Sequence, residues 1–254
     1  IEVLRTKWAV KADKRSAKVA AEGVIKLAVS ADNAQGFLVE INSETDFVSR
    51  DENFITLSGA LLSQVVETGT TDVAQASELT VAVGGEEKTF DAARQEVSSK
   101  VGENIKLRRI GHLAGEFVCG YAHGSRIGVL VVLDKAEPEL AKDIAMHVAA
   151  CNPRALNEAA VCQDVLAKER EIYTNQAKES GKPDNIIEKM VEGRVQKFLK
   201  EECLVSQPFV KCPDQTVADL LAEKGANVIA YLRYELGEGI EVEAVDFAAE
   251  VQAQ

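Results

Sequence analysis

The order of predicted elements along this chain of 254 residues constrains its fold most strongly, because the same order occurs twice. A β-hairpin is followed by helices and then by a single strand, which indicates an internal duplication at long period. The first copy comprises two β-type runs at 24–30 and 37–42, helical segments at 54–65 and 72–100, and a strand at 104–110. Within 72–100 we expect a loop at Gly84-Gly85 and a short extended piece at 80–83. The second copy comprises the corresponding segments at 116–121, 126–133, 138–148, 217–221 and 228–236. We expect an α+β fold in which helices cover one face of each of two small antiparallel sheets.

The second copy is interrupted by a helix-rich insertion at 156–204. Gly181-Lys182-Pro183 divides this insertion into two helices. Narrow apolar stripes run along both helices and predict an antiparallel pair, a helical coiled-coil arm that projects from the body. The apolar positions are Val161, Val165 and Ile172 before the break and Ile187, Met190, Val191, Val195 and Phe198 after it.

These patterns predict the domain organisation of the chain. We expect a basic helical arm or linker, an N-terminal core unit, a C-terminal core unit in two pieces, the inserted arm and a terminal helix with Phe247, Ala248 and Val251 at helical spacing. The basic arm is expected at 1–19, the N-terminal core unit at 20–114 and the C-terminal core unit at 115–155 with 205–242. The inserted arm is expected at 156–204 and the terminal helix at 243–254.

Composition excludes several classes of function. The net charge of −12 argues against a nucleic-acid-binding protein that works by phosphate neutralisation. No apolar run is as long as a membrane span, and no signal-peptide pattern opens the chain. The five cysteines form no Cys-x-x-Cys pair, so we expect reduced thiols in a cytoplasmic protein and neither a disulfide framework nor a zinc site.

The first 26 residues are locally basic, with seven Lys or Arg against three acidic residues. Two interpretations stay open for this segment. It is either a solvated helix without a specific function or a patch that steers the chain toward an acidic protein.

An unusual polar segment at 42–54 follows the second β-type run. It contains Phe47 and Val48 among mostly polar or charged neighbours. In one interpretation Thr45 or Asp46 caps a short helix, and Phe47 with Val48 packs beneath it as local core. In the other, Phe47 is held out as an anchor for the pocket of a partner.

Motifs for covalent chemistry are absent from the sequence. No phosphate-binding loop occurs, and Gly237-Glu238-Gly239 lacks the third glycine of a dinucleotide fingerprint, so we expect a turn there. His147 lies on a predicted helix and is expected to be a satisfied structural histidine. His123 lies at a hairpin tip, where a turn residue and an exposed functional residue are both plausible. We therefore expect no enzyme, no cofactor and no metal site.

The segment Thr45-Asp46-Phe47-Val48 resembles the signature of the elongation factor Ts family. That family comprises exchange factors for the translational GTPase elongation factor Tu, and the likeness is to its bacterial type. Further stretches of the chain are similar to the same family in the same order: 20–23, 102–105, 123–129, 144–150, 180–183, 189–194, 207–210 and 237–241.

The resemblance implies which residues contact the GTPase. Asp46 and Phe47, with Thr45 and Val48 beside them, match the pair that inserts between two helices of the partner and dislocates its Mg²⁺. Three further residues match contacts with the nucleotide domain: Val101, Gly102 and His123. The family often has Ile where this chain has Val101, which is a mild departure.

The resemblance also implies a small helical module ahead of Ile1, most of which this sequence lacks. In the family the inserted arm can mediate dimerisation. An alternative function is therefore a cytoplasmic adaptor that self-associates through 156–204 and has lost exchange activity. A metal-dependent hydrolase is a more distant alternative.

Overall fold

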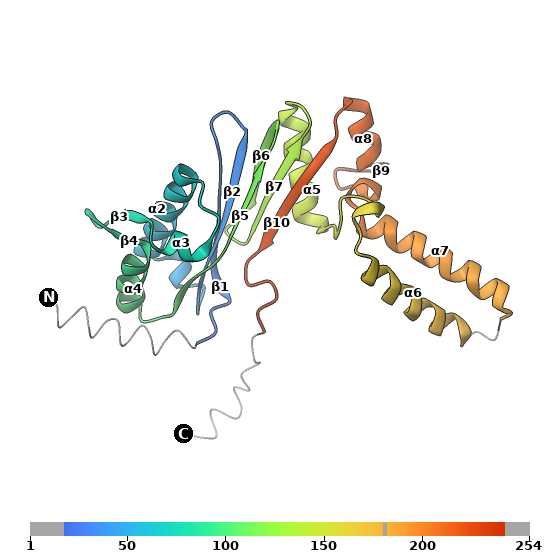
Figure 1. Cartoon of the computed structure of the whole chain (residues 1–254), viewed down its shortest axis with the longest axis horizontal. Coiled ribbons are helices and arrows are strands. Elements are labelled where there is room, and N and C mark those ends of the chain that lie inside the picture. The colour runs from blue at the N-terminus through green and yellow to red at the C-terminus, as the bar shows by residue number, and fades with distance from the viewer. Residues whose placement is uncertain (1–17, 180–181, 242–254) are drawn as a thin grey trace, which may run out of the picture.

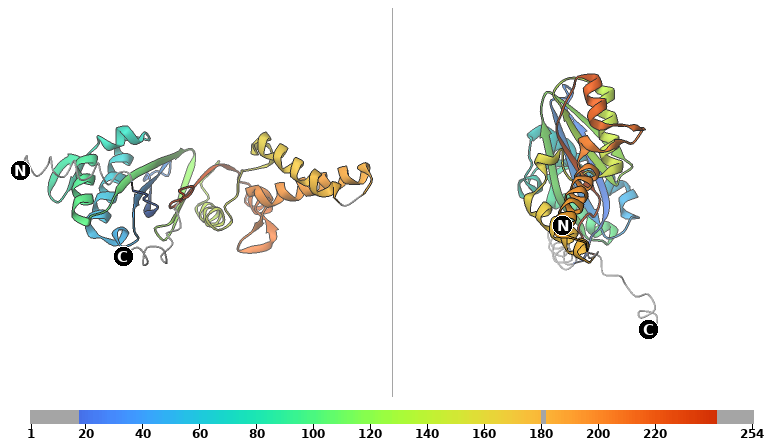
Figure 2. Two further views of the ribbon diagram at one scale, coloured as in Figure 1. Left: turned by 90° about the horizontal axis from the view of Figure 1, so that it is seen from below. Right: turned by 90° about the vertical axis from the view of Figure 1, so that its right-hand side faces the viewer.

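The chain is described by a computed structural model that covers residues 18–179 and 182–241. The predicted basic arm, apart from its last residues, and the predicted terminal helix lie outside the described residues. Helices and small antiparallel sheets are mixed along the chain, so the α+β prediction is confirmed. Two sheets lie side by side in the centre of the molecule, with helices on the outer side of each (Figures 1 and 2).

Each of the two main sheets has three antiparallel strands in the same order. The first two strands along the chain form a hairpin, and the third strand pairs with the second strand of that hairpin. The first sheet consists of β1 (Glu22–Val29), β2 (Gln35–Ser43) and β5 (Ile105–Ala114). The second consists of β6 (Phe117–His123), β7 (Ile127–Leu133) and β10 (Val228–Glu235). The repeated order seen in the sequence is therefore also an order of strand pairing.

The outer face of the first sheet is covered by helices that the sequence largely predicted. In α2, the longest of these helices, the apolar residues recur at helical spacing, and Phe54, Leu57 and Leu61 are fully buried against the sheet. Gly69 ends this helix in the left-handed conformation, with φ 68°. A hairpin of two short strands stands where one extended piece was expected, because Gly84 and Gly85 form its two-residue turn with positive φ. The elements are η1 (Val48–Arg50), α2 (Glu52–Thr68), α3 (Val73–Ser77), β3 (Thr80–Val83), β4 (Glu86–Thr89) and α4 (Phe90–Val101).

The second sheet is covered mainly by one helix, which begins at Pro138 as predicted. Its buried residues, including Leu140, Ile144 and Val148, pack against the outer face of the sheet. A short two-stranded hairpin follows the inserted arm and was not expected from the sequence. The elements are α5 (Pro138–Cys151), η3 (Leu204–Ser206), β8 (Pro208–Phe209), β9 (Cys212–Thr216) and α8 (Val217–Lys224).

The inserted segment forms two helices that pack on each other and extend away from the sheets (Figure 1). They are α6 (Gln163–Lys178) and α7 (Asp184–Glu202), preceded by η2 (Glu158–Ala160). Val191 and Val195 are buried between them, as predicted, whereas Ile172 is exposed and does not belong to the seam. The coiled-coil geometry and the domain boundaries stay predictions.

The inner faces of the two sheets pack on each other, and glycines make room for side chains of the opposite sheet. A Cβ atom at Gly128 of β7 would lie 2.6 Å from Leu38 and 2.7 Å from Ile25 of the first sheet. A Cβ at Gly36 of β2 would in turn lie 2.8 Å from Leu130 of the second. Sheets usually pack about 10 Å apart with side chains between them. Here the glycines on each sheet receive side chains of the other, which holds the two sheets in one relative position.

This packing predicts the effect of filling one of the glycine positions. Gly128→Ala is expected to lower the free energy of unfolding by about 1–3 kcal/mol, because the new methyl group overlaps two buried side chains. Gly193→Ala on α7 is the matched control, since a Cβ there meets nothing within 4 Å and Ala favours a helix by roughly 0.5–1 kcal/mol. Chemical denaturation of both variants tests this. Equal stability of the two variants would contradict close packing of the sheets.

Candidate partner-binding site

The loop between β2 and α2 presents one aromatic ring to solvent and buries its neighbour. Phe47 is 79% exposed, whereas Val48 is only 6% exposed and belongs to the core of the first sheet. The short helix η1 has no side-chain cap, and Asp51 caps α2 by accepting hydrogen bonds from the amides of Asn53 and Phe54, so neither Thr45 nor Asp46 caps a helix. The interpretation that Phe47 is local core is therefore wrong. Val48 anchors the loop, and Phe47 points outward.

Glutamate side chains brace this loop against the segment after α4. Glu103 accepts two hydrogen bonds from Thr45, at 2.9 Å from the backbone amide and 2.6 Å from the hydroxyl. In the opposite direction, Glu44 accepts a hydrogen bond from the amide of Asn104 at 2.6 Å. Bonds to a carboxylate are among the stronger hydrogen bonds in proteins. Two carboxylates, one from each segment, thus hold the loop that carries Phe47 against the segment after α4.

The brace can be tested without reference to any partner. Glu103→Ala removes both acceptors from Thr45, and each bond to a charged group contributes about 1.5–3 kcal/mol. We expect hydrogen exchange at the Thr45 amide to accelerate about 10- to 100-fold by local opening. Glu87→Ala, at an exposed position of β4, is the control and should leave this exchange rate unchanged. An unaltered rate in Glu103→Ala would refute the brace.

Asp46 is exposed and forms a weak local pair. Its carboxylate lies 3.2 Å from the guanidinium of Arg50, and both side chains are largely in solvent. Its backbone carbonyl accepts a hydrogen bond from the hydroxyl of Ser49 at 2.6 Å. An exposed ion pair of this kind contributes roughly 0–1 kcal/mol. The Asp46 carboxylate can therefore exchange Arg50 for a donor on another protein at little cost.

Val101 and Gly102 lie at the end of α4, directly before the bracing residue Glu103. Val101 is half-buried against the core, and Gly102 is exposed with φ 85°. This positive φ suits the glycine that ends a helix. The contacts between Glu103 and Thr45 bring this predicted pair beside the Phe47 loop.

His123 is the last residue of β6 and is exposed as expected for a hairpin tip. Its Nδ1 atom lies 3.3 Å from the hydroxyl of Tyr121. The hairpin tip is joined to β1 by an ion pair of 3.0 Å between Arg126 and Glu22. Because Glu22 is the register partner of Ser43 on β2, the His123 turn and the Phe47 loop lie at the same end of the two sheets.

Among the described residues no metal-type cluster is found, and His147 has a structural environment. Within residues 18–179 and 182–241, no three His, Cys, Asp or Glu side chains are grouped as a metal would need. His147 is fully buried, and its Nε2 donates to Gln207 at 2.9 Å while its Nδ1 accepts from the Val210 amide at 3.1 Å. Burial lowers the pKa of His147. The prediction of a satisfied structural histidine is confirmed.

Sequence reasoning missed the residues that hold the site together. Glu44 and Glu103 were not singled out, although Glu103 lies in one of the stretches that resemble the family. A polar loop that carries one exposed Phe needs a contact elsewhere in the chain. No local spacing identifies a bracing residue that lies 58 positions away.

Comparisons with known proteins now give the class. A sequence profile described as "Elongation factor TS" matches residues 44–238. The chain is 48% identical to Elongation factor Ts of Coxiella burnetii (strain RSA 493 / Nine Mile phase I) and 50% identical to that of Hahella chejuensis, covering all of this chain and 86% of each relative. It is 47% identical to Elongation factor Ts of Legionella pneumophila (strain Paris), over 99% of this chain and 85% of the relative.

These sequence matches place the chain among translation elongation factors. The chain belongs to the elongation factor Ts family. Membership implies nucleotide exchange on elongation factor Tu during protein biosynthesis. Within the described part of the chain, no helix combines the length and the apolar character that crossing a membrane requires.

Proposed function

We propose that this chain binds elongation factor Tu with GDP bound and inserts Phe47 between helices of the GTPase beside its Mg²⁺ and phosphate site. GDP release then becomes faster. The observation that supports this most directly is the 79% exposure of Phe47 on a loop whose neighbours are fixed. An exposed aromatic on a rigid support can enter a pocket with little loss of conformational entropy.

The proposed mechanism is differential binding of two states of the GTPase. A GTPase holds GDP partly through Mg²⁺, which neutralises phosphate oxygens. A ring that displaces the helices around the metal weakens the metal and phosphate contacts together. Nucleotide and exchange factor are then negatively coupled, and this coupling is reciprocal.

The size of the effect requires more than one contact. A ten-thousand-fold acceleration of GDP release corresponds to about 5.5 kcal/mol. Burying one Phe side chain contributes roughly 1.5–3 kcal/mol. We therefore assign contacts to Asp46, Val101, Gly102 and His123 as well, and the shared location of their loops supports one continuous interface.

Stopped-flow release of a fluorescent GDP analogue from elongation factor Tu tests the proposal. We expect the intact chain to accelerate release in a concentration-dependent manner. Excess GDP should weaken binding of the chain by the same factor by which the chain weakens binding of GDP. Absence of any acceleration at saturating chain would overturn the proposed function.

Self-association through the arm is a second proposal, and the exposed Ile172 and Ile186 on α6 and α7 favour it. Their side chains are 47% and 42% exposed on helices whose other large apolar residues are buried or half-buried. Sedimentation of the isolated chain should then show a dimer, and Ile172→Glu should shift it to the monomer. A monomer at all concentrations would exclude this role.

A further inference from the structure

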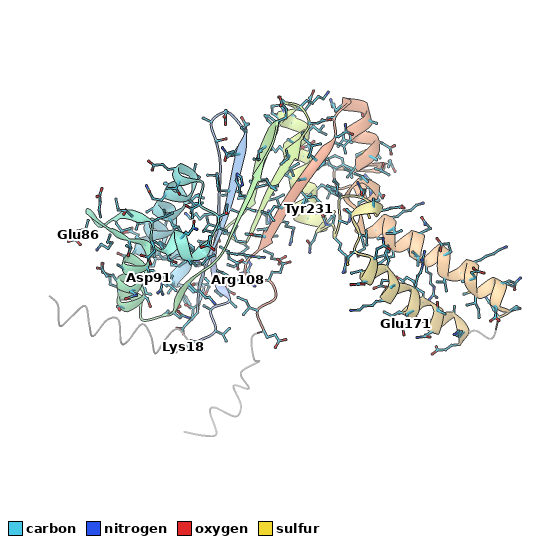
Figure 3. The ribbon with its side chains drawn as sticks, viewed as in Figure 1. Lys18, Glu86, Asp91, Arg108, Glu171 and Tyr231 are labelled. Atoms are coloured by element: carbon cyan, nitrogen blue, oxygen red, sulfur yellow. The ribbon has the colours of Figure 1, made fainter. Side chains whose placement is uncertain are left out.

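The outer strand of the second sheet has a free edge on the side nearest to the inserted arm (Figure 1). Within residues 18–179 and 182–241, β10 pairs with β7 alone. The amide of Leu236, directly after β10, donates to the carbonyl of Arg126 at 2.8 Å. Because backbone groups alternate in direction along an antiparallel strand, those of Tyr231 (labelled in Figure 3) and Arg233 face away from β7. An extended peptide can add to such an edge as a further strand.

The open part of this edge runs from residue 229 to residue 233. Nearer the end of β10, the carbonyl of Glu235 accepts a hydrogen bond from Arg109 of β5 at 3.0 Å, which closes the edge there. A hollow of about 520 Å³ borders residues 229–233, and its other lining residues are 152–156 and Ala160. Five strand residues span about 17 Å. The hollow therefore follows the edge over the length of a short strand.

The other edge strands of the two sheets are bonded to neighbouring segments. The amides of Ile25 on β1 and Val118 on β6 donate to loop carbonyls at 2.7 Å and 2.6 Å. The carbonyl of Ile105 on β5 accepts a hydrogen bond from Arg94 at 2.8 Å. Of these edges, that of β10 combines unpaired backbone groups with an adjacent hollow.

The hollow is cationic in a chain whose net charge is −12. Arg154 and Arg233 line it, and none of its lining residues is Asp or Glu. The side chain of Arg233 is only 8% exposed, and its Nη2 donates to Glu235 at 2.8 Å. Its Nη1 is buried and has no hydrogen-bond partner among the described residues. Because a buried donor is costly to leave unpaired, the site favours an occupant that carries a carboxylate.

The two faces of β10 determine how such an occupant is arranged. Ala230 and Leu232 pack into the core between the two sheets, whereas Tyr231 packs on the opposite face, toward the core under α5. Side chains of an added strand also alternate between the two faces. Apolar side chains therefore fit beside Ala230 and Leu232, and acidic side chains fit on the face that carries Arg233.

A second copy of this chain fits the edge poorly. If two β10 strands paired antiparallel about Tyr231, each Arg233 would lie opposite an Ile229 and would gain no carboxylate. Two chains that each carry a net charge of −12 also repel one another. The charges favour a different protein as the occupant.

We propose that residues 229–233 of β10 bind an extended acidic segment of another protein, which adds to the second sheet as a further strand. Its apolar side chains lie beside Ala230 and Leu232, and one of its carboxylates binds Arg233. This inference does not rest on the proposed exchange activity. Its test uses no GTPase, so failure of one leaves the other unaffected.

A capped peptide of alternating Val and Glu is the probe, and amide hydrogen exchange of the full chain is the measurement. At saturating peptide, exchange at the amides of Tyr231 and Arg233 should slow at least tenfold, because both amides gain a hydrogen bond. The amide of Leu27 on the edge strand β1 is the internal control and should keep its rate.

Modified peptides separate strand addition from attraction between charges. In the proposed register the Glu residues of the peptide lie opposite Tyr231 and Arg233, so their amides face β10 and the Val amides face away. N-methylation of every Glu should weaken binding at least tenfold, whereas N-methylation of every Val should leave it within about twofold. A peptide of alternating Val and Lys should bind at least tenfold more weakly than the Val and Glu peptide.

A substitution in the chain tests the location of the site. Ile229→Glu should weaken binding of the Val and Glu peptide at least tenfold, because it places a carboxylate on the exposed edge beside an acidic ligand. Val210→Glu is the matched control, at another exposed apolar position that does not line this hollow.

Unchanged exchange at Tyr231 and Arg233 in the presence of millimolar peptide would overturn the proposal. Equal affinity of the two N-methylated peptides would overturn it as well. Slow exchange at these amides in the chain alone that becomes fast on dilution would assign the edge to a second copy, and this result would also overturn the proposal.

Discussion

Phe47→Ala is expected to reduce the acceleration of GDP release from elongation factor Tu about 30- to 1000-fold. A central aromatic anchor typically contributes about 2–4 kcal/mol to an interface, and each 1.36 kcal/mol corresponds to a factor of ten in rate. The ring is 79% exposed in the free chain, so its removal takes nothing from the core. The free energy of unfolding should change by less than about 0.5 kcal/mol.

Ile229→Ala is the matched control for this experiment. Ile229 is also a large exposed apolar residue, at 57%, but it lies on β10 of the second sheet. Its removal should leave the exchange rate within about twofold of the original. If Phe47→Ala and Ile229→Ala had equal rates, the exposed ring would not be the element that acts on the nucleotide site.

The conformation of this loop shows the limit of local sequence reasoning. Spacing alone favoured burial of Phe47, because most loop aromatics are buried. In the structure Val48 takes the core position and Phe47 takes the exposed one. The difference is decided by Glu103 and Glu44, which are bonded to Thr45 and Asn104 across the first unit. No pattern within 42–54 contains that information.

The fold was more accessible to sequence reasoning than the site. Both hairpins and α2 follow from local periodicity, which is a property of consecutive residues. The short hairpin β3–β4 was predicted only in part, and β8–β9 was missed, because strands of two to five residues carry little periodic signal. The close packing of the sheets was also missed. It depends on glycines such as Gly36 and Gly128 whose neighbours are far away in the chain.

A buried charge cluster is the other feature that sequence reasoning missed. Glu40 stands between the apolar residues Val39 and Ile41 of β2 and is fully buried. Its carboxylate accepts hydrogen bonds from Arg108 at 2.9 Å, Arg109 at 2.5 Å and the amide of Gly237 at 2.9 Å. Figure 3 labels Arg108 on β5, where it also donates to the carbonyl of Glu238. The cluster thus joins β2, β5 and the turn after β10.

Glu40→Gln should therefore lower the free energy of unfolding by about 3–5 kcal/mol near neutral pH. The substitution removes the charge of a fully buried carboxylate that pairs with the half-buried Arg108 and Arg109, and breaking a buried ion pair costs about this much. Glu22→Gln is the control, since its pair with Arg126 is partly exposed and contributes at most about 1 kcal/mol. Urea unfolding of both variants measures the difference. Equal small losses would show that the Glu40 cluster does not hold the sheets and the final turn together.

Glu40 is also expected to make the free energy of unfolding depend on pH, which gives a second and independent test. Burial raises the pKa of Glu40, but the Gly237 amide and the guanidinium groups of Arg108 and Arg109 outweigh it, so the pKa lies below the ordinary 4.5. The unfolded chain then binds the proton first as pH falls, and stability rises with pH in this range. The contribution of Glu40 is fully present above pH 4.5 and is lost as pH falls through the folded pKa. In Glu40→Gln this part of the dependence should vanish. The stability difference between the original chain and the variant should therefore shrink below pH 4.5, and a constant difference would exclude a charged Glu40 as its cause.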